Sequence, residues 1–369
     1  MSFKELRPYL VTAILMSLAW SLRGQFGHLK GALIPGALSA VAVALLSPAG
    51  PWREALWRSL LLSAFGFSLG GQLGYGSLIR EILASTSLSV STAGFLKLFF
   101  IGAVWGGLGM TYLGLGLSEK PIKTRDLLLW GGLALLGWFV PELPVLAFLF
   151  AALQLYNLLR KKSKTIAVFG TLGALGFGTG FLLSVLLLFL GQRGFLGEGW
   201  PWWSLRDQFL GLWGGLFIWG AVKQSLQADL LPAPWGAGPL VQKGALSVYL
   251  VWIPGISTYN ALRHWGMDPS IFSPLPLGII ALGFVSFFSL LFAMILRLKN
   301  EKFSGAEERK LLSRSTFFFL WYLSFIAIAK EMLRYGWGRW EFGFTLFLVF
   351  SLLLTGVLLQ RKEESSDLV

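Results

Sequence analysis

The chain lacks cysteine and has few charged residues. Without cysteine it can form no disulfide bond, thiolate metal site or cysteine nucleophile. Charged residues account for 13% of its 369 residues, about half the share typical of a soluble protein. None of its three asparagines begins an Asn-x-Ser/Thr sequon, which agrees with a bacterial protein. The sequence has no phosphate-binding loop, redox-cofactor motif or metal-ligand cluster, so we expect no cofactor and no metal.

Apolar residues dominate instead. They make up 55% of the chain, give a mean hydropathy of +0.68, and recur in continuous runs from end to end. Continuous runs favour transmembrane helices over short strands of alternating polarity. The sequence therefore predicts an all-α polytopic integral membrane protein with about 12 transmembrane helices. The predicted segments are 8–26, 31–48, 55–77, 94–117, 126–140, 143–160, 165–191, 207–224, 244–262, 275–297, 315–337 and 341–360.

The distribution of basic residues predicts how the chain is oriented. The fifth and sixth segments are short, so ten or eleven crossings remain an alternative to twelve. On the twelve-helix map, 21 of the 31 lysines and arginines lie on the side of the N-terminus. Such a bias predicts a protein of the cell inner (plasma) membrane with both termini on the cytoplasmic side. It also explains the net charge of +13 without nucleic acid, and makes membrane lipids the expected neighbours.

A polar stretch interrupts the apolar pattern early in the chain and has a partial copy later. The stretch WSLRGQFGHLKGA begins at Trp20, and WSLRDQFLGLWGG begins 183 residues later at Trp203. Tryptophan, arginine and glutamine are uncommon in apolar chains, so the match indicates either a duplication or a coincidence between two interfacial segments, and both remain open. A duplication would divide one membrane domain into two six-helix halves, residues 1–164 and 165–369, with no separate soluble domain.

Two parallel six-helix halves resemble, in helix count and repeat spacing, the major facilitator superfamily of secondary transporters. The resemblance implies a substrate site near the interface of the halves. It does not extend to the charged loop motif of that superfamily, because the loop from Ser47 to Arg53 contains arginine but no aspartate. Many glycines lie four residues apart, which predicts close packing of helices. Examples are Gly66/Gly70, Gly102/Gly106, Gly176/Gly180 and Gly211/Gly215.

Ionisable and amide side chains gather where the predicted helices approach the outer face. Arginine suits bidentate contact with carboxylate or phosphate, and the acids nearby are too few to pair every cation. We therefore expect these groups to converge on an anionic ligand; the alternative is that each extends to lipid headgroups from a helix end. The expected anion-binding residues are Arg23, Gln25, Arg206, Gln208 and Arg334. The expected proton-coupling residues are His28, Asp207 and Glu331.

Two functions fit this pattern. The first is a gradient-driven transporter or flippase for an anionic small molecule or an anionic lipid-linked substrate. In it Arg23 and Arg206 hold the anion, with backbone N–H groups added if a helix begins at Asp207–Gln208 or around Gly31. The alternative is an integral membrane transferase acting on a lipid or polyprenyl phosphate at the outer face. Arg-Gly-x-x-x-His, from Arg23 to His28, is similar to short segments of bacterial lipid-modifying transferases, and His28 would be its catalytic base.

Overall fold

The computed structural model describes residues 2–47, 50–85, 88–160, 163–197, 200–234, 239–265, 305–335 and 351–356. Every regular element among these residues is a helix, so the predicted all-α fold is confirmed for them. The chain separates into two compact units, Met1–Ala245 and Leu246–Val369. Each unit is described by itself.

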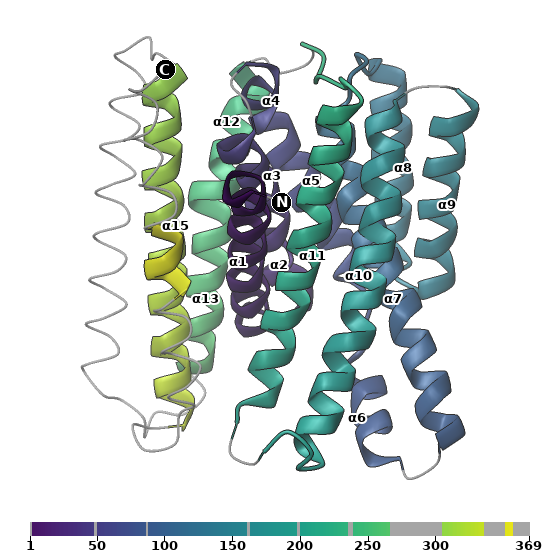
Figure 1. Cartoon of the computed structure of the whole chain (residues 1–369), viewed down its shortest axis with the longest axis vertical. Helices are drawn as coiled ribbons and strands as arrows, with labels where there is room; N and C mark the ends of the chain where they lie inside the picture. The colour runs from purple at the N-terminus through teal and green to yellow at the C-terminus, as the bar shows by residue number, and fades with distance from the viewer. Residues whose placement is uncertain are drawn as a thin grey trace. The chain divides into compact units, whose positions relative to one another are not determined.

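The first unit is a set of long helices with several short ones between them (Figure 1). In chain order they are α1 (Phe3–Phe26), α2 (His28–Gly31), α3 (Leu33–Leu46), α4 (Pro51–Glu54), α5 (Leu56–Gly70), α6 (Gly76–Ala84), α7 (Leu88–Gly116), α8 (Thr124–Phe139), α9 (Leu143–Leu159), α10 (Lys164–Gln192), α11 (Trp202–Gln227) and α12 (Pro239–Ser247), the last of which crosses the boundary between the units.

Helices α7 and α10 form the centre of the first unit and run antiparallel. A Cβ atom added to Gly106 would lie 2.5 Å from the carbonyl oxygen of Gly173. One added to Gly114, eight residues later, would lie 3.0 Å from the Cα of Ile166, seven residues earlier. Only glycine allows backbones to approach this closely. The predicted role of the spaced glycines in close packing is therefore confirmed for this pair.

Helix α11 packs between α10 and α1 in the same manner. A Cβ on Gly211 would lie 2.8 Å from the Cα of Ser17, and one on Gly215 would lie 2.6 Å from the Cα of Ala13. A later residue of α11 contacts an earlier residue of α1, so these two helices are also antiparallel. This register carries the last turns of α1 toward the first turns of α11.

Helix α5 lies against α7 and ends halfway along it. A Cβ on Gly116 would touch the Cα of Ser59 at 2.5 Å, and one on Gly70 would lie 2.8 Å from the Cα of Trp105. The chain then leaves the helical conformation over residues 71–75 and resumes as α6. On α6, Ile79 and Ile82 are buried.

The apolar runs located the helices well. The eight predicted segments between residues 8 and 224 overlap α1, α3, α5, α7, α8, α9, α10 and α11. The third, 55–77, is too long, because α5 ends at Gly70 and residues 71–75 are not helical. The fifth and sixth segments are separate helices, with only residues 140–142 between them. The tenth segment, 275–297, and all of the twelfth except 351–356 lie outside the described residues.

Two helices in the described part of the chain are long and apolar enough to cross a membrane. They are the Ser91–Gly116 part of α7 and the whole of α10, Lys164–Gln192. The number of crossings and the two six-helix halves stay predictions. The compact units divide the chain after Ala245 rather than after residue 164, and this division does not bear on an internal repeat.

The second unit contains the ninth and eleventh predicted segments. The ninth is the end of α12, a single π-helical turn at Val248–Trp252 and α13 (Ile253–Trp265), and the eleventh lies in α15 (Gly305–Tyr335). Helix α13 packs on α15, and the hydroxyls of Thr258 and Tyr322 are 2.6 Å apart between them.

Candidate functional site

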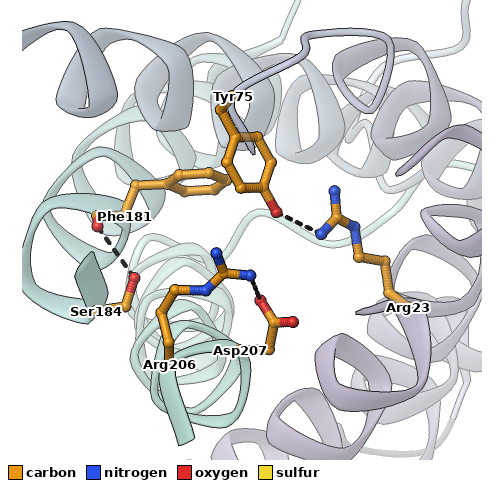
Figure 2. A network of polar contacts seen from close by, with 6 residues as sticks. All are labelled: Arg23, Tyr75, Phe181, Ser184, Arg206 and Asp207. Carbon is orange, nitrogen blue, oxygen red and sulfur yellow. Dashed lines mark hydrogen bonds and ion pairs between the residues drawn. The ribbon is translucent and has the colours of Figure 1, made fainter. Parts of the chain in front are cut away.

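Two buried arginines from α1 and α11 approach the same tyrosine. The side chains of Arg23 and Arg206 belong to residues that are 1% and 7% exposed. Nη1 of Arg23 donates to the hydroxyl of Tyr75 at 2.5 Å, and the guanidinium carbon of Arg206 lies 5.6 Å from the centre of the Tyr75 ring. Figure 2 shows both guanidinium groups pointing toward Tyr75 from different helices. The structure thus brings together two residues that are 183 positions apart.

Asp207 supplies the negative charge of this group. Its Oδ1 accepts a hydrogen bond from Nη2 of Arg206 in an ion pair of 2.5 Å, and the residue is 9% exposed. Its other oxygen faces α1, because a Cβ on Gly24 would lie 2.5 Å from Oδ2. We call Arg23, Tyr75, Arg206 and Asp207 the arginine cluster. It contains two guanidinium groups and one carboxylate.

Aromatic rings surround the guanidinium groups. The guanidinium carbon of Arg23 lies 4.6 Å from the ring centre of Trp105 and 5.3 Å from that of Trp20, while that of Arg206 lies 5.2 Å from that of Trp203. Cation–π contacts of this kind stabilise a desolvated cation by about 2 kcal/mol. Because the rings carry no formal charge, they hold the cations without neutralising them.

Several buried polar groups on α1 and α11 lack a hydrogen bond within the described part of the chain, among them Oε1 of Gln208, in a residue 4% exposed, and Nε1 of Trp20, in a residue 0% exposed. Gln208 follows Asp207 on α11, and Trp20 touches Arg23 through its ring. Buried polar groups without a protein partner are uncommon. Oε1 of Gln208 is an acceptor and Nε1 of Trp20 is a donor.

The local course of α1 explains why Arg23 is buried. The helix continues through Phe26, and Gly27 then breaks it with φ of 93°, a value that favours glycine. The short α2 turns back so that Gly31 lies against α1, where an added Cβ would meet the Cα of Arg23 at 3.1 Å. Arg23 and Gln25 are therefore part of a helix, and Gln25 is half-buried.

The prediction that Asp207 begins a helix is wrong. Helix α11 begins at Trp202, so Arg206, Asp207 and Gln208 lie in its second turn. The apolar run starts only at Phe209, and the preceding WWSLRDQ sequence did not look helical from hydropathy alone. The N-terminal N–H groups of α11 are consequently not beside Asp207. The contribution expected from them is withdrawn.

Three of the expected site residues have side chains outside the described part of the structure. His28 begins α2, and Glu331 and Arg334 lie on α15 of the second unit, but only their backbone positions are described. Lys30 is exposed. The described site therefore consists of Arg23, Arg206, Asp207 and Gln208 from the prediction, with Gln25 nearby on α1.

Sequence reasoning missed Tyr75. It lies in the non-helical segment between α5 and α6, inside the glycine-rich sequence Gly-Gly-Gln-Leu-Gly-Tyr-Gly. A single tyrosine between closely spaced glycines at the end of an apolar helix was the available signal. Nothing in the sequence gave its distance from Arg23.

The arrangement can bind an anion but offers no metal site among the residues described. No group of three or more histidine, cysteine or acidic side chains in the described part of the chain could hold a metal ion. The two guanidinium groups suit a carboxylate or phosphate. Comparison of the chain with protein-family models, curated proteins and solved structures finds no match.

Proposed function

We propose that the protein is a multi-pass membrane transporter or flippase for an anionic small molecule or anionic lipid-linked substrate. One observation carries the proposal: Arg23 and Arg206, on two antiparallel helices, are both buried against Tyr75. Buried arginines are costly unless they serve a ligand or a partner. Arginine pairs bidentately with carboxylate and phosphate groups, so two guanidinium groups on one tyrosine suit an anionic ligand.

The membrane setting rests on composition and helix length. Helices α7 and α10 are long and apolar enough to cross a bilayer, and the ten other predicted segments bring the total to about twelve crossings. The excess of basic residues on the N-terminal side favours cytoplasmic termini in an inner membrane. In this orientation the last residues of α1 and the first of α11 point to the outer face.

Asp207 gives the proposed transporter a means of coupling to protons. An anion bound between the two guanidinium groups competes with the Asp207 carboxylate for Arg206. Anion binding would therefore release Asp207 from Arg206, and Asp207 is the proton carrier in this proposal. His28 and Glu331 remain alternative proton carriers in the proposal.

The test compares two arginines. Purified protein is screened for thermal stabilisation by phosphate, sulfate, glycerol phosphate, citrate and short-chain phosphatidylglycerol, and uptake or flipping of each stabilising anion is measured in proteoliposomes. Arg23→Gln should abolish both effects. Arg193→Gln, which removes an exposed arginine at the end of α10, should leave them unchanged. An equal response of the two variants, or no stabilisation of the wild type by any probe, would contradict the proposal.

The position of α2 keeps a transferase as the second candidate. Gly31 of this turn packs on the backbone of Arg23, so the turn that begins with His28 adjoins the arginine cluster. In a transferase His28 would act as general base, while the arginines bind the phosphate. His28→Gln would then abolish turnover and preserve anion binding. In a transporter that uses Asp207 for coupling, it would preserve both.

A further inference from the structure

The depth of the arginine cluster follows from the number of residues between it and the ends of the two candidate spanning helices, α7 and α10. Trp105, whose ring contacts Arg23, lies 11 residues before the end of α7, which is about 16 Å at the rise of an α-helix. Phe181, whose ring centre is 5.1 Å from that of Tyr75, lies 11 residues before the end of α10. Because α7 and α10 are antiparallel, these two ends are on opposite sides. The Tyr75 end of the cluster is therefore about 16 Å from each of these helix ends, near the middle of a hydrocarbon layer about 30 Å thick, whereas Asp207 lies five residues, or about 8 Å, from the start of α11.

Exposed, non-helical backbone occurs close to this depth. Gly74 adjoins Tyr75, is exposed, and has no atom within 4 Å of an added Cβ. Gly27 is likewise exposed, non-helical and surrounded by open space, one turn beyond Arg23. Backbone outside a helix cannot face lipid at membrane depth, because its N–H and C=O groups need partners; it occurs where protein buries it or water reaches it. Among the described residues of the first unit, protein does not bury it. Gly24, next to Arg23, and Ser77, two residues after Tyr75, are exposed as well.

The opposite side of the cluster is closed by rings. Trp20, Trp105, Phe67 and Phe177 are each 0% exposed. The ring centres of Trp20 and Trp105 are 5.1 Å apart, those of Trp20 and Phe177 5.6 Å, and those of Phe67 and Phe177 5.4 Å. These four side chains come from α1, α5, α7 and α10. They form a continuous aromatic layer on the side of Arg23 that is opposite to Gly74.

A second closure lies beyond this layer, at the C-terminal end of α7. The buried Arg58 donates from Nε to the carbonyl oxygen of Gly116 and from Nη2 to that of Ala233, both at 2.6 Å. The N–H of Ala233 donates to the carbonyl oxygen of Ser118 at 2.9 Å. These bonds fasten the segment after α11 to the end of α7. Arg58 thus closes the end of the helix group that is opposite to Gly74.

We propose that water and anions reach the arginine cluster from one side only, the side on which α7 begins and α10 ends. The approach passes exposed Gly74, Ser77 and Gly24, while the aromatic layer and Arg58 separate the cluster from the other side. The inference rests on the proposed membrane anion site, and on the proposed topology the open side is the outer face. The inference places Gly74 deep in the membrane and in contact with water.

The absence of cysteine makes single-cysteine labelling the direct test. Full-length Gly74→Cys, Ser77→Cys and Ser17→Cys variants are reconstituted in vesicles and treated with a charged, membrane-impermeant thiol reagent on one side at a time. Two exposed positions identify the sides: Arg193→Cys for the open side and Lys120→Cys for the closed side. Ser17, buried on α1 beyond the aromatic layer, is the matched deep control.

Cysteines at positions 74 and 77 should react from the same side as that at 193, within about tenfold of its rate, because exposure governs the rate of thiolate attack. The cysteine at 17 should not react from either side. Reaction of 74 and 77 from the side of position 120, or no reaction of either while 193 reacts, would overturn the inference. Two variants guard against one that fails to fold.

Protection by phosphate separates this inference from the proposed function. If phosphate slows labelling at position 74 in an Arg23-dependent way, both hold. If labelling is one-sided and neither phosphate nor any other probe of the stability screen slows it, the one-sided approach stands and the anion site fails. If phosphate stabilises the protein while positions 74 and 77 do not react, the anion site stands and the approach is wrong.

Discussion

Replacing Asp207 by asparagine removes the negative charge of the arginine cluster and little else. The carboxylate is 9% exposed and lies 2.5 Å from Nη2 of Arg206. At an effective dielectric constant of 20 the gross attraction at this distance is about 7 kcal/mol, and removing one partner of a buried pair usually costs about 3–5 kcal/mol. We expect Asp207→Asn to lower the free energy of unfolding by about 3 kcal/mol, since the amide still accepts a hydrogen bond.

An anion should reverse most of this loss. Two guanidinium groups then remain in the cluster without Asp207 to compete for Arg206, so phosphate binds the variant at least as tightly as the wild type. A ligand at a hundred times its Kd stabilises the folded state by about 2.7 kcal/mol, close to the amount lost. The assay is unfolding in mixed micelles with and without phosphate. The exposed Glu81→Gln on α6 is the control and should change stability by less than about 0.5 kcal/mol.

The reasoning is refuted if Asp207→Asn is as stable as Glu81→Gln. It is also refuted if Asp207→Asn is unstable and phosphate stabilises the wild type but not the variant. In the first case the ion pair contributes nothing. In the second, Asp207 is part of the anion site rather than its competitor.

Three other substitutions test the surrounding structure. Gly24→Ala places a methyl group 2.5 Å from Oδ2 of Asp207, which displaces the carboxylate from Arg206 and should tighten phosphate binding several-fold; Gly220→Ala, in open space on α11, should not change it. Arg58→Gln loses two charged hydrogen bonds, each contributing about 1.5–3 kcal/mol, and should make the segment after α11 sensitive to protease while Arg53→Gln does not. Glu119, between α7 and α8, accepts hydrogen bonds from Ser163 and from the N–H of Lys164. Burial of this carboxyl opposes its ionisation, but the hydrogen bonds outweigh burial and hold its pKa below the usual value. A lowered pKa stabilises the folded protein above the unfolded-state value of about 4.5, so wild-type stability should fall below that pH more steeply than that of Glu119→Gln.

Hydropathy located most helices because each of them contains a run of apolar residues. It failed where a helix contains polar residues that other helices bury. Helix α11 begins at Trp202, five residues before the predicted start, because Gly191 of α10 leaves room for the Trp202 ring and so packs this polar turn. The sequence alone contains no information on which neighbour covers a polar turn.

The candidate site could be predicted in part for a similar reason. Arg23 and Arg206 stood out because arginine is rare at such positions, and the matching Trp-Ser-Leu-Arg sequences paired them. The match does not extend to local structure: α1 ends at Phe26, three residues after its arginine, whereas α11 continues for 21 residues after Arg206. Tyr75 could not be predicted, since its place depends on how residues 71–75 turn at the end of α5.

The central claim is that Arg23 and Arg206 form one buried anion site with Tyr75. The anomalous scattering of selenate, a sulfate analogue, would locate such an ion in crystals of the wild-type protein. We expect one selenate between the two guanidinium groups, within hydrogen-bond distance of both, with the ion pair between Arg206 and Asp207 lengthened. Selenate bound at the protein surface alone, with each guanidinium group keeping its present partner, would contradict the claim.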